Sequence, residues 1–366
     1  MRESDTNKYV NSSRQFEVDC VKFFAIFYMV CIHVYEQYGS FDFYHRMPDS
    51  VFRNMMEFLG GPLAAPVFMF CMGIGMVYTR HKSDKDFIRR GWKLLLTGYC
   101  LNFFRQTLLQ LIGMIIGVET DLDIIGGLLN VDILQFAGMS FLTIGIMKRG
   151  KLSARTMCVI AVLMQAVGIW GTKLSIKSVA IQDIVGLILP TGKWVAFPLT
   201  LWMVYPVFGL YFGERLQTNM DKKKMYHKLI TAFGSLFVAY TVCLIYNGYD
   251  IRSFYALNND FYYHQIFLST LWILPIIICM LGICYYLFKS IEYTKFGSFI
   301  RYCSTNLNTI YIIQWLIIAY GVAFSILLGI DKTESAFVII SGGIVVLMMA
   351  IGITVLYKKV RKKRAN

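Results

Sequence analysis

The sequence contains little charge and few acidic residues. Charged residues make up 16% of its 366 positions, with 22 Asp or Glu against 36 Lys or Arg. Hydrophobic residues reach 57%, and aromatic residues alone account for 16%. A soluble chain of this length needs far more polar surface to cover its core. The composition therefore excludes a soluble globular protein and indicates a membrane protein.

The sequence signatures of several enzyme classes are also missing. The chain has no glycine-rich phosphate loop, no zinc-binding signature and no serine nucleophile elbow. Its 9 cysteines show neither metal-ligand spacing nor the pattern of a secreted disulfide framework. We therefore expect no metal cofactor, and we interpret the cysteines as small buried residues.

Long apolar runs recur along the whole chain, which predicts an all-α, polytopic membrane protein. A helix needs about 20 apolar residues to cross the hydrocarbon layer. About ten spans follow this pattern, with boundaries good to a few residues. They cover residues 18–38, 55–78, 87–105, 130–147, 155–170, 194–214, 227–246, 265–288, 307–327 and 336–357. The apolar stretch 106–118 either extends the third span outward or lies on the membrane surface.

The positive charges lie mostly on one side of these spans. With the N-terminus in the cytoplasm, 28 of the 36 Lys and Arg residues are cytoplasmic. This asymmetry follows the positive-inside rule and predicts that both termini are cytoplasmic. The chain then divides into a cytoplasmic segment (1–13), one transmembrane domain (14–357) and a basic cytoplasmic tail (358–366). The tail is interpreted as a topology anchor beside anionic lipid and not as a nucleic-acid site.

Lys22 and His33 are eleven residues apart in the first predicted span. Eleven residues are close to three helical turns, so both side chains point to nearly the same face, ~16 Å apart along the axis. Lys22 then lies at the cytoplasmic interface and His33 in the outer half of the bilayer, where ionisable groups mark functional sites. Taken singly, Lys22 is also explained as an interface residue and His33 as a packing hydrogen bond. Together they suggest an enzyme that works across the membrane.

Polar residues on the same helix are placed to support this pair. Glu36 and Gln37 follow His33 by three and four residues, so either side chain is positioned to orient the imidazole. Asp19 precedes Lys22 by three residues and is positioned to pair with it.

The first span resembles the signature of the membrane acyltransferase-3 family, in which an Asp and an Arg or Lys are followed by ten residues and a His. Here the segment is RQFEVDCVKFFAIFYMVCIH at 14–33. Other segments are similar to that family or to its relative, the heparan-α-glucosaminide N-acetyltransferase type. They are PVFMFCMGIG at 66–75, the basic start of the third span at 87–104, DILQFAG at 132–138, residues 197–213 and NLNTIYIIQW at 306–315. Gln314 stands where a His is common, and Phe136 where the glucosaminide type usually has Arg.

This resemblance implies an integral acyltransferase of the cell membrane, either a bacterial inner membrane or a plasma membrane. Its donor would be cytoplasmic acyl-CoA, with acetyl-CoA the first expectation. Lys22, Arg89 and Arg90 would form a cationic floor that binds the nucleotide phosphates. His33, with Glu36 beside it, would act as a general base or carry the acyl group covalently; both routes remain open.

The resemblance also implies an acceptor, the hydroxyl or amine of a cell-surface or lipid-linked sugar. Glu57, Arg105 and Asp132 lie near the outer ends of predicted spans and are the candidate acceptor-side residues. Arg105 and Asp132 are each equally explained as an interface charge. The alternative is a transporter or flippase of a lipid-linked or polar solute, which would use the same buried charges without chemistry. Gln314 alone suggests a third interpretation, a noncatalytic relative that acts as an assembly partner.

Overall fold

A computed structural model describes residues 10–40, 50–118, 123–174, 176, 178–191, 195–256 and 260–365. Within these ranges the chain is helical and forms no β-strand, only isolated bridges, which confirms the predicted all-α class. Residues 1–9, most of the predicted N-terminal segment, lie outside the described part.

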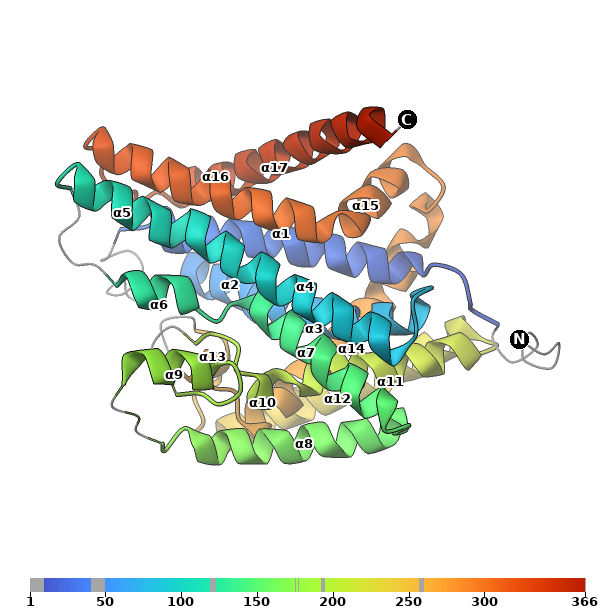
Figure 1. The fold of residues 1–366 in the computed structure, drawn as a ribbon. Helices are drawn as coiled ribbons and strands as arrows, with labels where there is room; N and C mark the ends of the chain where they lie inside the picture. The colour runs from blue at the N-terminus through green and yellow to red at the C-terminus, as the bar shows by residue number, and fades with distance from the viewer. Residues whose placement is uncertain are drawn as a thin grey trace.

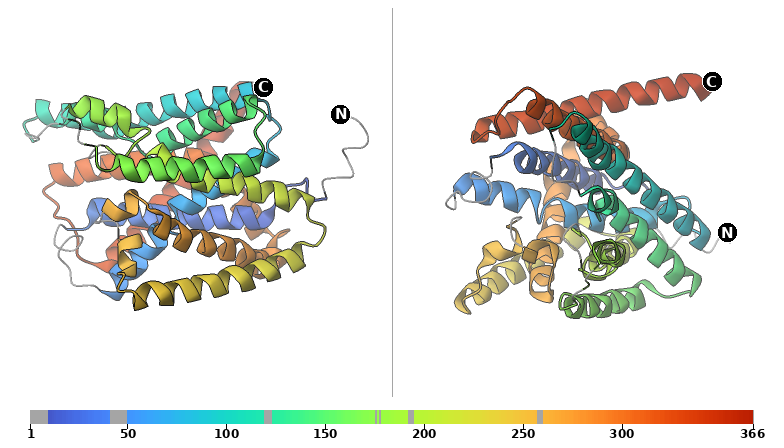
Figure 2. Two further views of the ribbon diagram at one scale, coloured as in Figure 1. Left: turned by 90° about the horizontal axis from the view of Figure 1, so that it is seen from below. Right: turned by 60° about the vertical axis from the view of Figure 1, so that its left-hand side comes forward.

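The long helices form one bundle with α1 inside it (Figure 1). They are α1 (Phe16–Tyr38), α3 (Ala65–Tyr78), α4 (Asp84–Asn102), α7 (Ile133–Arg149), α8 (Ala154–Gly171), α11 (Val204–Thr218), α12 (Lys222–Tyr246), α14 (Phe267–Phe288), α16 (Leu307–Leu327) and α17 (Ala336–Ala365). The short helices are α2 (Val51–Gly60), α5 (Leu108–Ile115), α6 (Ile124–Leu129), α9 (Val179–Gly186), α10 (Leu199–Trp202), α13 (Asp260–Tyr263) and α15 (Lys295–Thr305). Figures 1 and 2 show α17 and α8 at opposite edges of the bundle.

Seven helical stretches among the described residues are long and apolar enough to cross a membrane. Each coincides with a predicted span, so the chain is a multi-pass membrane protein. The other three predicted spans coincide with α4, α7 and the α10–α11 pair, which do not meet the same criterion. The basic cluster lowers the hydropathy of α4, while α7 and α11 are only 17 and 15 residues long. The number of ten spans therefore stays a prediction.

The outer helices expose apolar side chains. Only 6% of the most apolar window of α12 is buried inside the protein, and Val238 and Val242 on this helix are both 61% exposed. An exposed apolar helix is unstable in water and stable against hydrocarbon chains. The surface of α12 is therefore a surface for lipid.

Two predicted spans are interrupted or extended in ways that the sequence pattern did not resolve. The second predicted span, 55–78, is divided into α2 and α3 by a turn after Gly60. The third continues outward from α4 through a π-helical turn, η3 (Phe103–Thr107), into α5. The stretch 106–118 thus extends the third span, which was one of its two interpretations. π-Helical turns are rare and are frequently found at functional sites.

The start of α1 and the end of α17 lie at the same end of the bundle (Figure 1). This arrangement agrees with two termini on one side of the membrane, and which side it is stays a prediction. The basic tail continues α17 as helix up to Ala365.

Candidate functional site: two cavities along the first helix

The larger cavity opens at the end of the bundle where α1 begins. It has a volume of about 860 Å³ and is lined by residues of α1, α3, α4, α7, α16 and the segments beside them. Lys22, Arg89 and Arg90 all line it, together with Lys93. The structure therefore brings the three predicted donor-side cations to one cavity, hereafter the inner cavity. Its size lies within the range of small-molecule and cofactor sites, ~300–1,000 Å³.

Lys22 is half-buried and makes no hydrogen bond or ion pair with any described residue. The predicted pairing with Asp19 is wrong, because Asp19 binds Arg14 instead. Arg14 Nε lies 2.6 Å from Asp19 Oδ2 and Arg14 Nη2 2.7 Å from Oδ1, and the Ser304 hydroxyl donates to Oδ1 at 2.6 Å. Three donors thus occupy this carboxylate, which leaves the Lys22 ammonium available for an anionic ligand.

The start of α4 carries the other two cations. Ser83 and Asp86 form a capping box there, which satisfies the first backbone N–H groups of the helix. The Ser83 hydroxyl also donates to the Asp86 carboxylate, and this hydrogen bond lowers the pKa of that exposed acid. Arg90 lies over the Phe141 ring of α7, with its Cζ 4.7 Å from the ring centroid. Arg89 is exposed at the rim.

A second, smaller cavity of about 40 Å³ lies farther along α1 and is hereafter the outer cavity. His33, Glu36 and Asp132 line it, with apolar and aromatic walls. These walls are formed by Met29, Ile32, Gly60, Ala64, Ala65, Ile133, Phe197, Tyr262, Tyr263 and Tyr311. Three of the sequence-predicted site residues therefore meet here, from α1 and from the start of α7.

His33 is held by a residue of α16. Its Nδ1 lies 3.3 Å from Gln314 Oε1 and 3.2 Å from Gln314 Nε2, and Gln314 is fully buried. The imidazole also packs on the Trp315 ring, with centroids 4.1 Å apart. The prediction that Glu36 or Gln37 orients the imidazole is therefore wrong for this nitrogen. Glu36 accepts a hydrogen bond from Tyr263 instead.

Asp132 and Arg105 form an ion pair beside His33, in which the Arg105 side chain is 4% and the Asp132 side chain 16% exposed. Arg105 Nη2 lies 2.7 Å from Asp132 Oδ2, and the Tyr311 hydroxyl donates to the same oxygen at 2.8 Å. The backbone N–H of Ile133 donates to Asp132 Oδ1 at 2.7 Å. Arg105 belongs to the π-helical turn and lies over the Trp315 ring, 4.4 Å from its centroid. Both oxygens of Asp132 are thus occupied, and these contacts link η3, the start of α7 and α16 beside the imidazole.

Glu57, the remaining predicted acceptor-side residue, lies outside the lining of both cavities. Its Oε1 is 3.0 Å from Arg53 Nε one turn earlier on α2, and its side chain is buried. Glu57 therefore lines neither cavity, although it and Asp132 both lie close enough to Glu36 to interact with it electrostatically.

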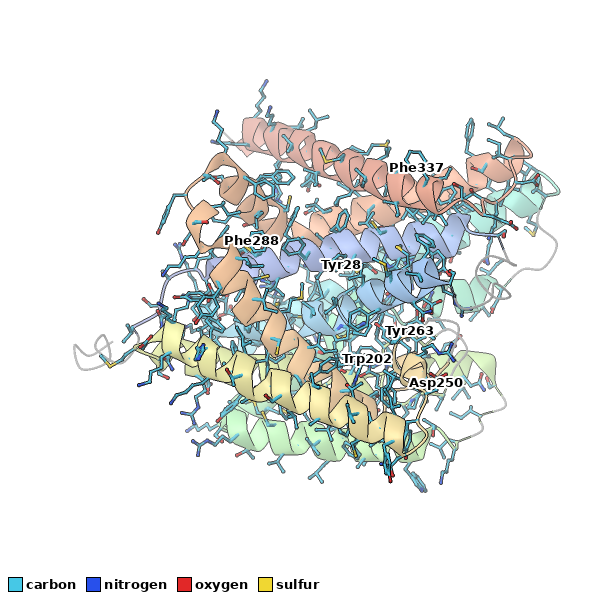
Figure 3. The ribbon with its side chains drawn as sticks, turned by 180° about the vertical axis from the view of Figure 1, so that it is seen from behind. Tyr28, Trp202, Asp250, Tyr263, Phe288 and Phe337 are labelled. Carbon is cyan, nitrogen blue, oxygen red and sulfur yellow. The ribbon has the colours of Figure 1, made fainter. Side chains whose placement is uncertain are left out.

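Aromatic residues close the far side of the outer cavity. Phe197 packs edge-on against Trp202 and Tyr263, with ring centroids 4.9 and 5.9 Å apart. The indole N–H of Trp202 donates to the backbone carbonyl of Tyr263 at 2.9 Å, and Figure 3 shows these two side chains near each other. Tyr262 donates to the carbonyl of Gly61, so the short α13 is tied to the α2–α3 turn.

A partition separates the two cavities. On α3, Ala65 lines the outer cavity and Phe68 the inner cavity, and on α7 the neighbours Ile133 and Leu134 line the outer and inner cavities respectively. Three residues of helix span ~4.5 Å, so on α3 the two linings come within one turn of each other. On α1 they are farther apart, because the last inner lining residue is Lys22 and the first outer one is Met29, ~10.5 Å along the axis. Both cavities lie between α1, α3, α7 and α16. They therefore lie along one face of α1, as the spacing of Lys22 and His33 predicted.

The chain matches the model of a known protein family. The model is described as an acyltransferase domain, and it matches residues 15–357, which includes every helix that lines the two cavities. No curated protein matches the chain.

Proposed function

The chain belongs to the acyltransferase-3 family of membrane acyltransferases, and we propose that it transfers an acetyl group from cytoplasmic acetyl-CoA to a hydroxyl or amine of a sugar. The acceptor is a cell-surface or lipid-linked sugar at the opposite side of the membrane. The family favours acyl transfer over transport without chemistry.

The inner cavity supports the proposed donor. Its cations, Lys22, Arg89 and Arg90, line one space of about 860 Å³ at the end predicted to face the cytoplasm. Guanidinium groups bind phosphate oxygens bidentately, whereas an ammonium contributes a point charge. Since Asp19 is occupied by Arg14, Lys22 meets the phosphates without an internal competitor.

His33 supports the proposed chemistry. Gln314 engages Nδ1, so Nε2 is the nitrogen left for the reaction. In the direct route, Nε2 takes the proton of the acceptor as its oxygen or nitrogen attacks the thioester carbon. The carbon–sulfur bond breaks, and the imidazolium returns the proton to the departing CoA sulfur. In the covalent route, Nε2 attacks the thioester carbon, the carbon–sulfur bond breaks and CoA leaves as the thiolate. The acceptor oxygen or nitrogen then attacks the acyl-histidine, the bond between the acyl carbon and Nε2 breaks, and the acceptor proton passes to the CoA thiolate.

One observation carries the proposal. Lys22 and His33 line two cavities on a common face of α1, and on the neighbouring α3 the linings of the two cavities come within one turn of each other. A donor bound by its phosphates in the inner cavity therefore has its reactive end directed along α1 toward the imidazole.

The proposal is tested by measuring CoA release from acetyl-CoA by the purified protein with an extract of surface glycans. His33→Ala is expected to lose activity by about 10²–10⁴-fold, which is the usual contribution of a general base. His227→Ala is the matched control, because His227 is exposed on α12, away from both cavities. Full activity of folded His33→Ala protein would contradict the role of this residue. Absence of CoA release from the unsubstituted protein would contradict the proposed function.

A further inference from the structure

We infer that the outer cavity is an acyl pocket that admits a two-carbon acyl group and rejects longer chains, with Ile133 as a wall that sets this limit. The inference rests on the proposed function, because it concerns the acyl group that reaches His33. It goes beyond that function by assigning the choice of acyl group to named residues.

The size of the cavity decides what it holds. A space of about 10–15 Å³ accommodates one water-sized group, and a space of about 150 Å³ is large enough for benzene. The outer cavity, at about 40 Å³, therefore holds about three such groups. An acetyl group has three heavy atoms beyond the sulfur, whereas a butyryl group has five. A sugar ring is larger still, so the acceptor presents its reactive atom to the cavity while its ring stays outside.

The walls of the cavity are fixed by packing and hydrogen bonds. Ile32, Ile133 and Tyr262 are each at most 3% exposed. A Cβ added at Gly60 would lie 2.5 Å from the Cβ of Ile32, so α2 already touches α1 there. Protein interiors are close-packed and respond to added volume with strain. A longer acyl chain therefore cannot be accommodated by small shifts of these walls.

Ile133 is the wall residue best suited to substitution. It belongs to the first turn of α7, directly after Asp132, and its apolar side chain makes no interaction that the proposed chemistry uses. Truncation of Ile133 enlarges the cavity beside His33 without removing a charge or a hydrogen-bond partner. Ile144 is a matched control, because it is equally buried on the same helix and lines neither cavity.

The experiment compares kcat/KM for acetyl-CoA, propionyl-CoA and butyryl-CoA. One methylene too many in a fitted apolar pocket reduces kcat/KM by about 10- to 200-fold. We expect the unsubstituted protein to prefer acetyl-CoA over butyryl-CoA by at least about 100-fold, and Ile133→Ala to reduce this preference at least about tenfold. Ile144→Ala is expected to keep the original preference. Ile133→Val gives a milder version of the same change if the alanine variant does not fold.

Comparable kcat/KM values for acetyl-CoA and butyryl-CoA in the unsubstituted protein would overturn the inference, while the proposed function would stand. Equal relaxation by Ile144→Ala, or none by folded Ile133→Ala, would also overturn it. If neither Ile133 variant folds, the ratio of kcat/KM for acetyl-CoA to that for butyryl-CoA in the unsubstituted protein decides whether the inference stands. CoA release from none of the three donors would refute the proposed function and with it the inference.

Discussion

At the scale of single residues, the central feature is the hydrogen bond between His33 and Gln314. A buried amide on α16 fixes the imidazole from the Nδ1 side, and the Trp315 ring packs against the imidazole ring. The orientation of the reactive group therefore depends on a residue 281 positions later in the chain. Gln314 acts on the reaction through His33 and is a positioning residue.

Replacement of Gln314 by Leu removes this hydrogen bond with little change in volume. We expect kcat to fall about 10- to 100-fold while KM for acetyl-CoA stays unchanged, because the inner cavity is untouched. Gln314→His restores a ring nitrogen that can bind His33 and is expected to keep most of the activity. Gln165→Leu is the control, since Gln165 is also a fully buried glutamine but binds Thr270 away from both cavities. A rise in KM with unchanged kcat would count against the positioning role.

The Arg105–Asp132 pair is expected to contribute to stability. Removal of one partner from a fully buried pair costs about 3–5 kcal/mol, and the partial exposure of Asp132 reduces this to about 2–3 kcal/mol. Asp132→Asn and Arg105→Met should each destabilise the protein by that amount, and the double variant should cost less than their sum. Unfolding in detergent, followed by circular dichroism, measures this double-mutant cycle. Additive effects would show that the two side chains do not act as a pair.

The local part of the site was predictable from the sequence, and its long-range part was not. Helical spacing alone placed Lys22 and His33 on one face, and composition alone identified the basic start of α4. Spacing gave Asp19 the wrong partner, because proximity along a helix does not reveal a competing Arg14. Gln314 stands where the acyltransferase-3 family commonly has a His. Nothing in the sequence around it shows that its side chain contacts His33.

At the scale of elements, α3 and α11 pack against each other at glycines. A Cβ at Gly73 would overlap the backbone carbonyl of Pro206, and one at Gly209 would overlap that of Phe70. Small residues let helix backbones approach closely in membranes. The same contact holds α3 in place, and α3 forms part of both cavities and of the partition between them.

Gly73→Ala is therefore expected to destabilise the protein by about 1–3 kcal/mol, because backbone atoms cannot move aside as a flexible side chain can. Gly352→Ala on α17 is the matched control, since no heavy atom lies within 4 Å of an added Cβ there. Alanine there only removes the conformational cost of glycine within a helix, so Gly352→Ala should stabilise the protein by about 1 kcal/mol or less. Thermal unfolding of both variants in the same detergent makes the comparison. Equal stability of the two variants would contradict the proposed importance of this helix contact.

At the scale of the whole molecule, the sequence predicted the class and the ten long helices but not the short ones between them, because lipid imposes length and hydropathy only on the spans. Less apolar helices such as α4 and α7 contribute polar and charged residues to the cavities. The turn between α2 and α3 and the π-helical turn of Arg105 were not predictable, since both depend on how helices pack. The orientation rests on the distribution of Lys and Arg.

This orientation predicts which loops face outward. Lys223→Cys, at the start of α12, should react with a membrane-impermeant maleimide only after cells are permeabilised. Lys332→Cys, between α16 and α17, should react in intact cells, and both lysines are exposed. The unsubstituted protein, labelled in the same way, measures the background reaction of the native cysteines with the maleimide. The reverse labelling pattern would invert the assigned topology and place the inner cavity on the outer side.

Acyl transfer across the membrane is tested most directly in sealed vesicles of both orientations that contain the purified protein. Labelled acetyl-CoA is supplied on one face and the glycan acceptor on the other. The account predicts labelled acceptor only when acetyl-CoA is on the face where α1 begins, and no label with His33→Ala. Labelled acceptor formed only when donor and acceptor share one face would contradict it.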